Sequence, residues 1–136
     1  MAKIMLFAAM AGIAGCASTM SEPTRADLIG GWAVEYIGER PVIDNSPAYM
    51  EFNEEGRVAG NSSCNQFTGT YVMSGDSLVF SKLASTKKMC PPALMEQETS
   101  FLTALEGVAK VRFEKGLLML LDSNDKMLVK ASRRPK

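Results

Sequence analysis

Short segments of alternating residues, separated by turn residues, are the feature of this sequence that most limits its fold. Apolar or small residues occupy every second position in the stretches 32–37, 48–53 and 67–73, and glycine or asparagine lies close to the end of each stretch. This period of two is typical of β-strands with one face buried. Further strands are expected at the following positions: 57–60, 78–80, 111–113, 117–121 and 127–129.

One segment has the period of a helix, at about residues 92–107. Pro91 and Pro92 suit a helix start and Gly107 suits a helix end. Between them, apolar residues recur at spacings of three and four, which predicts one apolar face. The expected fold class is α+β, with a mainly antiparallel, strongly curved sheet or partly closed barrel of about eight strands and this helix packed on it.

The N-terminus has the pattern of an export signal. Lys3 precedes an apolar run over 4–13, and Ala14-Gly15 precedes Cys16. The run is about half of the roughly 20 residues that a spanning helix needs. The sequence 13–16 resembles the bacterial lipobox, which implies a lipid on Cys16 and cleavage just before it. A hydrophobic N-terminal element of the folded domain is the alternative.

These features divide the chain into four parts. We expect a lipoprotein signal peptide over 1–15, a flexible tether over 16–26, one folded domain over 27–132 and a basic tail over 133–136. Cys16 is followed by alanine and not by aspartate, and the resemblance then favours the outer membrane. The expected location is the bacterial cell envelope, at the periplasmic face of the outer membrane, with the membrane as a partner through the lipid anchor.

Charge gives no sign of a nucleic-acid partner. The chain carries 15 basic and 15 acidic residues, so it has no basic excess, and no stripe of basic and aromatic residues is present. The basic tail alone is more typical of a frayed end than of a binding patch. We therefore expect no nucleic-acid partner.

Two cysteine-containing blocks and the helix after them resemble a known family. The first block contains Gly60, Cys64, Asn65, Phe67, Gly69 and Tyr71, and the second contains Leu83, Ala84, Thr86 and Cys90. This order resembles the META/HslJ family of bacterial envelope proteins, over about residues 28–131. Glu98 and Phe101 match the helix pattern of the family, with Glu96 as an alternative, and Trp32 also fits.

The resemblance implies a small β-rich fold with one helix and no established enzyme activity. The family is linked by name to heat shock and to tolerance of the antibiotic novobiocin, and many members are lipoproteins. One departure is Ser63, where many members have glycine directly before the cysteine.

Cys64 and Cys90 are candidates for a disulfide bond. In an exported protein, paired cysteines tend to form a disulfide, so we expect a Cys64–Cys90 bond that joins the strand block to the helix start. Two separate buried thiols and a redox-active pair are the alternatives.

Four polar residues lie near glycines and could line a small polar pocket: Asn61, Asn65, Tyr71 and Thr86. The alternative is that they bond to turn backbone or pack in the core. The run 122–125 is expected to be a hairpin turn and not a calcium loop, because it lacks the EF-hand frame. The methionines outside the signal are scattered, which favours packing over a copper site. No cofactor and no metal are expected.

Catalysis is hard to build from this sequence, because the chain contains no histidine. Triads that use histidine, and zinc sites with histidine ligands, are therefore excluded. A carboxylate pair such as Glu35 and Glu51 is the remaining acid–base candidate. We expect a non-enzymatic, lipid-anchored envelope protein with a role in stress or drug tolerance, which binds a protein or a small apolar molecule. A structural or assembly role is the alternative, and an enzyme is the third hypothesis.

Overall fold

The computed structural model describes residues 5, 12 and 22–135 of the 136-residue chain. Cys16, the predicted signal peptide and most of the predicted tether therefore lie outside the described residues, and the predictions about them stay predictions. Within the described part, no helix is both long enough and apolar enough to cross a membrane.

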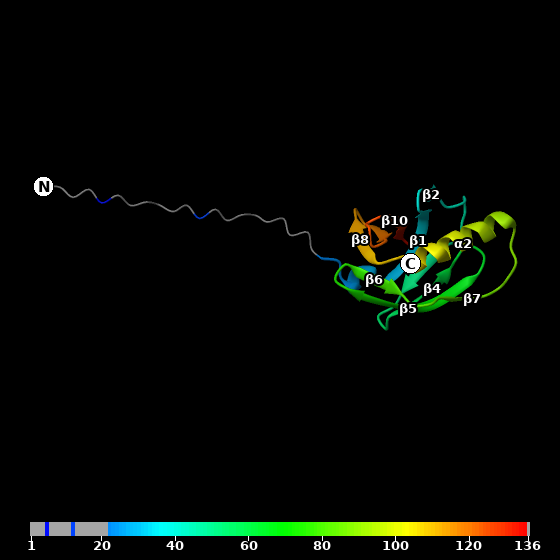
Figure 1. Ribbon diagram of the computed structural model, residues 1–136, viewed down its shortest axis with the longest axis horizontal. Helices are drawn as coiled ribbons and strands as arrows, with labels where there is room; N and C mark the ends of the chain where they lie inside the picture. The colour runs from blue at the N-terminus through cyan, green and yellow to red at the C-terminus, as the bar shows by residue number, and fades with distance from the viewer. Residues whose placement is uncertain (1–4, 6–11, 13–21, 136) are drawn as a thin grey trace.

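The described residues form ten strands and two helices (Figure 1). In chain order they are α1 (Arg25–Leu28), β1 (Gly30–Ile37), β2 (Arg40–Pro41), β3 (Tyr49–Phe52), β4 (Arg57–Asn61), β5 (Gln66–Ser74), β6 (Ser77–Phe80), β7 (Ala84–Ser85), α2 (Pro92–Glu106), β8 (Lys110–Glu114), β9 (Leu117–Leu121) and β10 (Met127–Arg133). The predicted helix is α2, which ends one residue before Gly107.

Eight of these strands close into an antiparallel barrel. Their order around it is β1, β3, β4, β5, β6, β8, β9 and β10, and β10 pairs back with β1. The two short strands lie outside this ring, β2 beside β1 and β7 beside β5. The α+β prediction is confirmed, and the pairing of the first strand with the last makes the barrel closed.

The junction between β6 and β8 is the shortest pairing in the ring. Its register contains the single pair Ser77 and Lys110. Two backbone hydrogen bonds flank this pair, from Leu78 N to Ala109 O at 3.0 Å and from Val111 N to Asp76 O at 2.8 Å. Beyond this contact the two strands no longer pair, so the barrel wall has a seam here.

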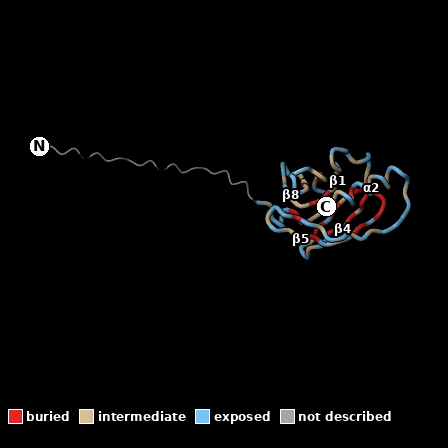
Figure 2. The backbone as a smooth tube through the Cα atoms, in the orientation of Figure 1, coloured by how far each residue is buried: buried red, intermediate tan, exposed pale blue. Residues whose placement is uncertain are grey.

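Apolar side chains from both helices and from the strands fill the barrel. The alternation predicted from sequence places Phe52 and Phe67 inside, each about 1% exposed. Leu28 of α1 and Phe101 and Leu105 of α2 are fully buried in the same core. Figure 2 shows these buried segments in the centre of the domain, with exposed turns around them. Side chains therefore fill the interior of the barrel.

Regular structure in the described residues begins with α1 at Arg25 and ends with β10 at Arg133. Arg133, predicted as the start of the basic tail, is the last residue of β10 and pairs with Trp32. Its guanidinium carbon lies 4.0 Å from the centre of the Trp32 ring, and it donates hydrogen bonds to the carbonyls of Ile29 and Asp27. Helix α1 likewise begins at Arg25, inside the segment predicted as a tether. These contacts explain why the ordered strand includes a residue that looks like tail in the sequence.

Candidate functional site

Glu98 is a buried carboxylate on the main helix. It is 6% exposed. Its Oε1 atom accepts hydrogen bonds from Ser62 Oγ at 2.6 Å, from Asn65 N at 2.7 Å and from Cys64 N at 3.4 Å. Its Oε2 atom accepts one from Asn65 Nδ2 at 2.9 Å. Burial raises the pKa of the Glu98 carboxyl, but these hydrogen bonds outweigh burial and hold the pKa below its usual value.

Asn65 joins Glu98 to the segment before the helix. Its side chain is buried, and its amide oxygen accepts hydrogen bonds from Thr86 Oγ1 at 2.9 Å and from Lys88 N at 2.7 Å. Its amide nitrogen donates to Lys88 O at 3.1 Å as well as to Glu98. One side chain therefore holds together the β4–β5 turn, the segment around β7 and helix α2.

The Cys64–Cys90 disulfide is present, as predicted. The sulfurs are 2.03 Å apart, the Cα atoms are 5.9 Å apart, and the two residues are separated by 26 positions. The bond links the β4–β5 turn to the residues before α2, which are the same segments that Asn65 and Glu98 connect.

The four residues predicted to line a polar pocket are not all brought together. Asn65 and Thr86 are in contact, and Asn61 lies in the same turn, where its side-chain oxygen accepts from Ser63 N at 2.8 Å. Tyr71 lies elsewhere: its hydroxyl donates to Asn53 O at 2.6 Å and its ring packs against Phe52. All four side chains thus bond to or pack against the chain itself. Asn61, Asn65 and Thr86 lie together with Glu98 and the Cys64–Cys90 disulfide. We call this set the brace, because it connects the β4–β5 turn to the segment around β7 and to α2.

The backbone at Ser63 has a conformation that favours glycine, the residue that the family resemblance implies at this position. Its φ angle is +118°, a backbone conformation that side chains rarely adopt. Its hydroxyl accepts a hydrogen bond from Gln97 Nε2 at 3.1 Å, so a contact with the helix supports the serine in this conformation.

A cleft of about 630 Å³ is lined by Glu22 and Pro23, the first residues described in the domain, and by residues of β8. Figure 1 shows the first blue segment of the domain beside β6 and β8. Its lining combines acidic, basic and apolar residues from the segment before α1, from α1, β1, β8, β9 and β10, and from three turns: Glu22, Pro23, Ala26, Asp27, Trp32, Asp76, Lys110, Val111, Arg112, Phe113, Gly116, Leu121, Asp125 and Arg133. Because several of these segments lie far apart in the sequence, no local pattern indicated the cleft.

The floor of the cleft is aromatic. The rings of Trp32 and Phe113 are 5.9 Å apart, and Trp32 Nε1 donates to Leu28 O at 2.8 Å. Arg133 covers Trp32, which is 2% exposed, whereas Phe113 is half-buried. Phe113 therefore supplies aromatic surface that a bound molecule can reach.

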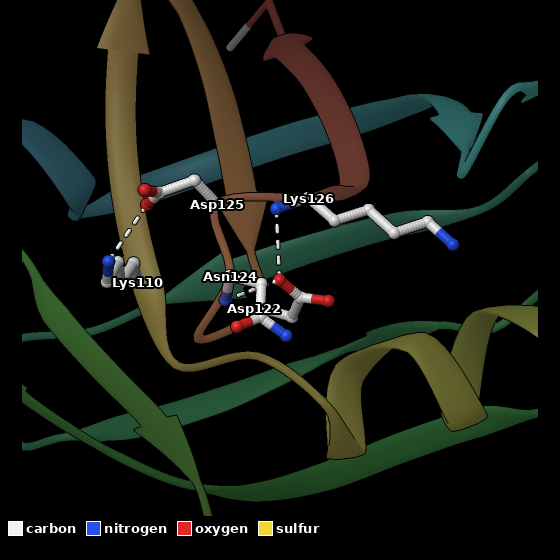
Figure 3. A network of polar contacts seen from close by, with 5 residues as sticks. All are labelled: Lys110, Asp122, Asn124, Asp125 and Lys126. Atoms are coloured by element: carbon white, nitrogen blue, oxygen red, sulfur yellow. Dashed lines mark hydrogen bonds and ion pairs between the residues drawn. The ribbon is translucent and has the colours of Figure 1, made fainter.

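An ion pair forms part of the cleft wall (Figure 3). Lys110 Nζ lies 2.9 Å from Asp125 Oδ1. This hydrogen bond and the opposite charge raise the pKa of Lys110 and lower the pKa of Asp125. Asp122 Oδ1 accepts hydrogen bonds from the backbone of Asn124 and Lys126, so the run 122–125 is the predicted hairpin turn.

A second, smaller groove of about 290 Å³ lies on the outer face of strands β3 to β5. Glu51 borders it and pairs across the sheet with Gly31, not with Glu35. The two carboxylates considered as an acid–base pair are thus not opposite each other in the sheet.

Comparisons with known proteins give a family and a fold. The family model of the META domain matches residues 26–134. The heat shock protein HslJ of Escherichia coli strain K12 is 27% identical over 135 residues, which cover 96% of each chain. A protein solved by NMR is 26% identical with a TM-score of 0.60, over 76% of this chain and 89% of the other.

Two further solved structures support the fold alone. An NMR structure of a protein from Burkholderia xenovorans has a TM-score of 0.63 at 21% identity, over 80% of this chain and 85% of the other. A crystal structure of a DUF4847 family protein from Bacteroides vulgatus has a TM-score of 0.60 at 14% identity, over 80% and 95%.

Proposed function

The chain belongs to the META domain family, and from this premise we propose that it is a lipid-anchored protein of the bacterial envelope that contributes to stress tolerance by binding another molecule. The anchor is a lipid on Cys16, and the location is the periplasmic face of the outer membrane. The binding site is the cleft beside Glu22, and the partner is an envelope protein or a small molecule with an apolar part.

One observation carries this proposal: the cleft lies beside Glu22, where the N-terminal segment joins the domain. Glu22 and Pro23 line the cleft, and Glu22 follows Cys16 by six residues. Six residues span at most about 20 Å when fully extended. A lipid on Cys16 would therefore hold the cleft within about 20 Å of the membrane, where it can meet molecules of the envelope.

The relative named above supports a role in stress. It is a heat shock protein by name and is similar over almost the whole chain. A role in tolerance of heat or of drugs that act on the envelope is the part of the proposal that rests on this similarity.

The chemistry of the side chains supports binding over catalysis. The chain has no histidine. The buried carboxylate of Glu98 has a lowered pKa and its oxygens already accept four hydrogen bonds, so it is poorly suited to donate or accept a proton near neutral pH.

An assembly role is the second candidate, and one surface feature favours it. Val72 and Val79 face each other across the β5–β6 hairpin and are 71% and 52% exposed. An exposed apolar pair on a sheet surface is suited to contact another protein. In this case the domain would support a larger envelope complex.

The first experiment tests the anchor in cells. A strain that lacks the gene is complemented with the wild-type chain, with Cys16→Ser or with the control Thr19→Ser. We expect Cys16→Ser to remain unprocessed, to lack the lipid and to fail to restore tolerance of heat or of envelope-active drugs, whereas the control restores it. Normal processing and membrane retention of Cys16→Ser would refute the anchor.

The second experiment separates the two candidate roles. Phe113→Ser alters the cleft, and Val72→Thr with Val79→Thr alters the hairpin surface. If the cleft carries the function, Phe113→Ser reduces tolerance and the valine variant does not. The opposite result, with loss of a stoichiometric partner from the native lipidated protein, would support assembly.

A further inference from the structure

The basic side chains of the cleft already have partners. Lys110 pairs with Asp125 at 2.9 Å, and Arg112 pairs with Glu114 at 3.4 Å. Arg133 donates hydrogen bonds to two backbone carbonyls and stacks on Trp32. These contacts occupy the cationic groups within the cleft.

The cleft has four acidic side chains, and two of them, Glu22 and Asp76, lack such a partner. Asp27 accepts hydrogen bonds from Thr24 at the start of α1, and Asp125 pairs with Lys110. In contrast, the carboxylates of Glu22 and Asp76 form no hydrogen bond and no ion pair with any residue of the part 22–135, although the charge of Asp76 contributes to the raised pKa of Lys110. The charge left without a partner in the cleft is therefore negative.

These two carboxylates border the same side of the cleft. A Cβ atom at Gly75 would lie 2.5 Å from Glu22 Oε1, so the Glu22 carboxylate lies against the β5–β6 turn. Asp76 is the next residue of that turn and also lines the cleft. Two like charges near one turn repel each other, and a bound cation would remove this repulsion.

The remaining lining determines what else the ligand carries. Phe113 is half-buried, and Pro23 and Ala26 add apolar surface from the chain start. The cleft volume of about 630 Å³ is within the range of sites that hold small organic molecules. A bare metal ion would leave this apolar surface uncovered, whereas an amine with an apolar body would use both parts.

We propose that the cleft binds a small organic cation, an amine on an apolar body, with the ammonium group at Glu22 and Asp76 and the apolar body toward Phe113. This inference rests on the proposed function, because it names the class of ligand that the cleft would take.

The single tryptophan of the chain makes binding measurable. Trp32 lies in the cleft floor, so its fluorescence should change when the cleft is occupied. The full chain with Cys16→Ser is titrated with hexylamine, and 1-hexanol and hexanoate serve as neutral and anionic probes of the same length. We expect a saturable change with hexylamine, which weakens as salt is added, and little or no saturable change with the two other probes.

Charge-removing variants test the placement of the amine. Glu22→Gln and Asp76→Asn should each weaken hexylamine binding by about three- to fivefold, the range of an exposed ion pair. Glu39→Gln and Asp44→Asn remove exposed carboxylates that do not line the cleft and should leave binding unchanged. Equal urea midpoints of all four variants ensure that a loss of binding is not a loss of folding.

Two results would overturn the proposal: equal responses to hexylamine and 1-hexanol, or unchanged affinity in both Glu22→Gln and Asp76→Asn. These failures are distinct from failure of the proposed function. If hexylamine does not bind but Phe113→Ser still reduces stress tolerance, the ligand class is wrong and the cleft function stands. If hexylamine binds but cleft variants retain full tolerance in cells, the ligand class stands and the proposed function is wrong.

Discussion

Replacing Glu98 by glutamine should destabilise the protein strongly, although the two side chains have nearly the same shape. The carboxylate accepts four hydrogen bonds and donates none. Glutamine offers one oxygen and one NH₂ group. In either orientation of the amide, its NH₂ group faces a donor, at Asn65 Nδ2 or at the backbone N–H of Asn65.

The magnitude follows from these contacts. A buried donor left without an acceptor costs about 1–3 kcal/mol, and hydrogen bonds to a charged group contribute about 1.5–3 kcal/mol against roughly 1 kcal/mol for neutral ones. The neutral side chain is easier to bury, which offsets part of the loss. We therefore expect Glu98→Gln to lower the free energy of unfolding by about 3 kcal/mol.

Urea unfolding at neutral pH, followed by Trp32 fluorescence, measures this change. Glu96→Gln is the matched control, because Glu96 is exposed on the same helix and should change stability by less than about 0.5 kcal/mol. A loss of less than about 1 kcal/mol in Glu98→Gln would refute the reasoning, because the stability that these hydrogen bonds contribute would then not depend on the charge of the carboxylate.

The Glu98 carboxyl should also make the free energy of unfolding depend on pH. The pKa of Glu98 in the folded protein lies below its usual value of 4.5. Its contribution to stability is therefore fully present above pH 4.5 and is lost as pH falls through the folded pKa. Glu98→Gln should remove this part of the acid destabilisation, and Glu96→Gln should keep it.

Substitutions at three further places test the fold around the β4–β5 turn. Replacing Cys64 and Cys90 by serine, in a chain whose N-terminal cysteine is also serine, should lower the free energy of unfolding by about 3.5 kcal/mol for a loop of 26 residues, and reduction of the disulfide-containing chain should give the same loss in urea unfolding. Gly60→Ala should prevent normal folding, as judged by circular dichroism, because its Cβ would overlap the carbonyl oxygen of Tyr49 on the adjacent strand. Ser63→Gly should change the free energy of unfolding by less than about 1 kcal/mol, whereas Ser63→Val should lower it by about 3 kcal/mol, as measured by thermal unfolding. The reason is that a branched side chain is strongly disfavoured at a φ of +118°. Equal stability of the two variants would contradict this.

Most elements of the fold could be predicted from sequence because their signals are local. The period of two predicted strands such as β5, and the period of three and four predicted α2. The disulfide could also be predicted, because an export signal, which the sequence predicts, would imply an oxidising compartment. These inferences need only neighbouring residues or a general rule about location.

The closure of the barrel and the cleft could not be predicted in the same way. Closure depends on pairing of β1 with β10, which no local pattern encodes. The cleft brings Glu22, Asp76 and Phe113 together from three distant segments. The sequence indicates Glu98 only as a family position, and its role depends on donors from the β4–β5 turn, far from it in sequence.

The pairing of the first strand with the last has a consequence for the order of folding. Arg133 bonds to the carbonyl of Ile29, 104 residues away in the chain, so the barrel cannot close before β10 has been made. Contacts between such distant residues form slowly. If such a chain crosses a membrane from its N-terminus, its barrel cannot close until β10 has also crossed. The chain would therefore remain unfolded during translocation and would complete its fold afterwards.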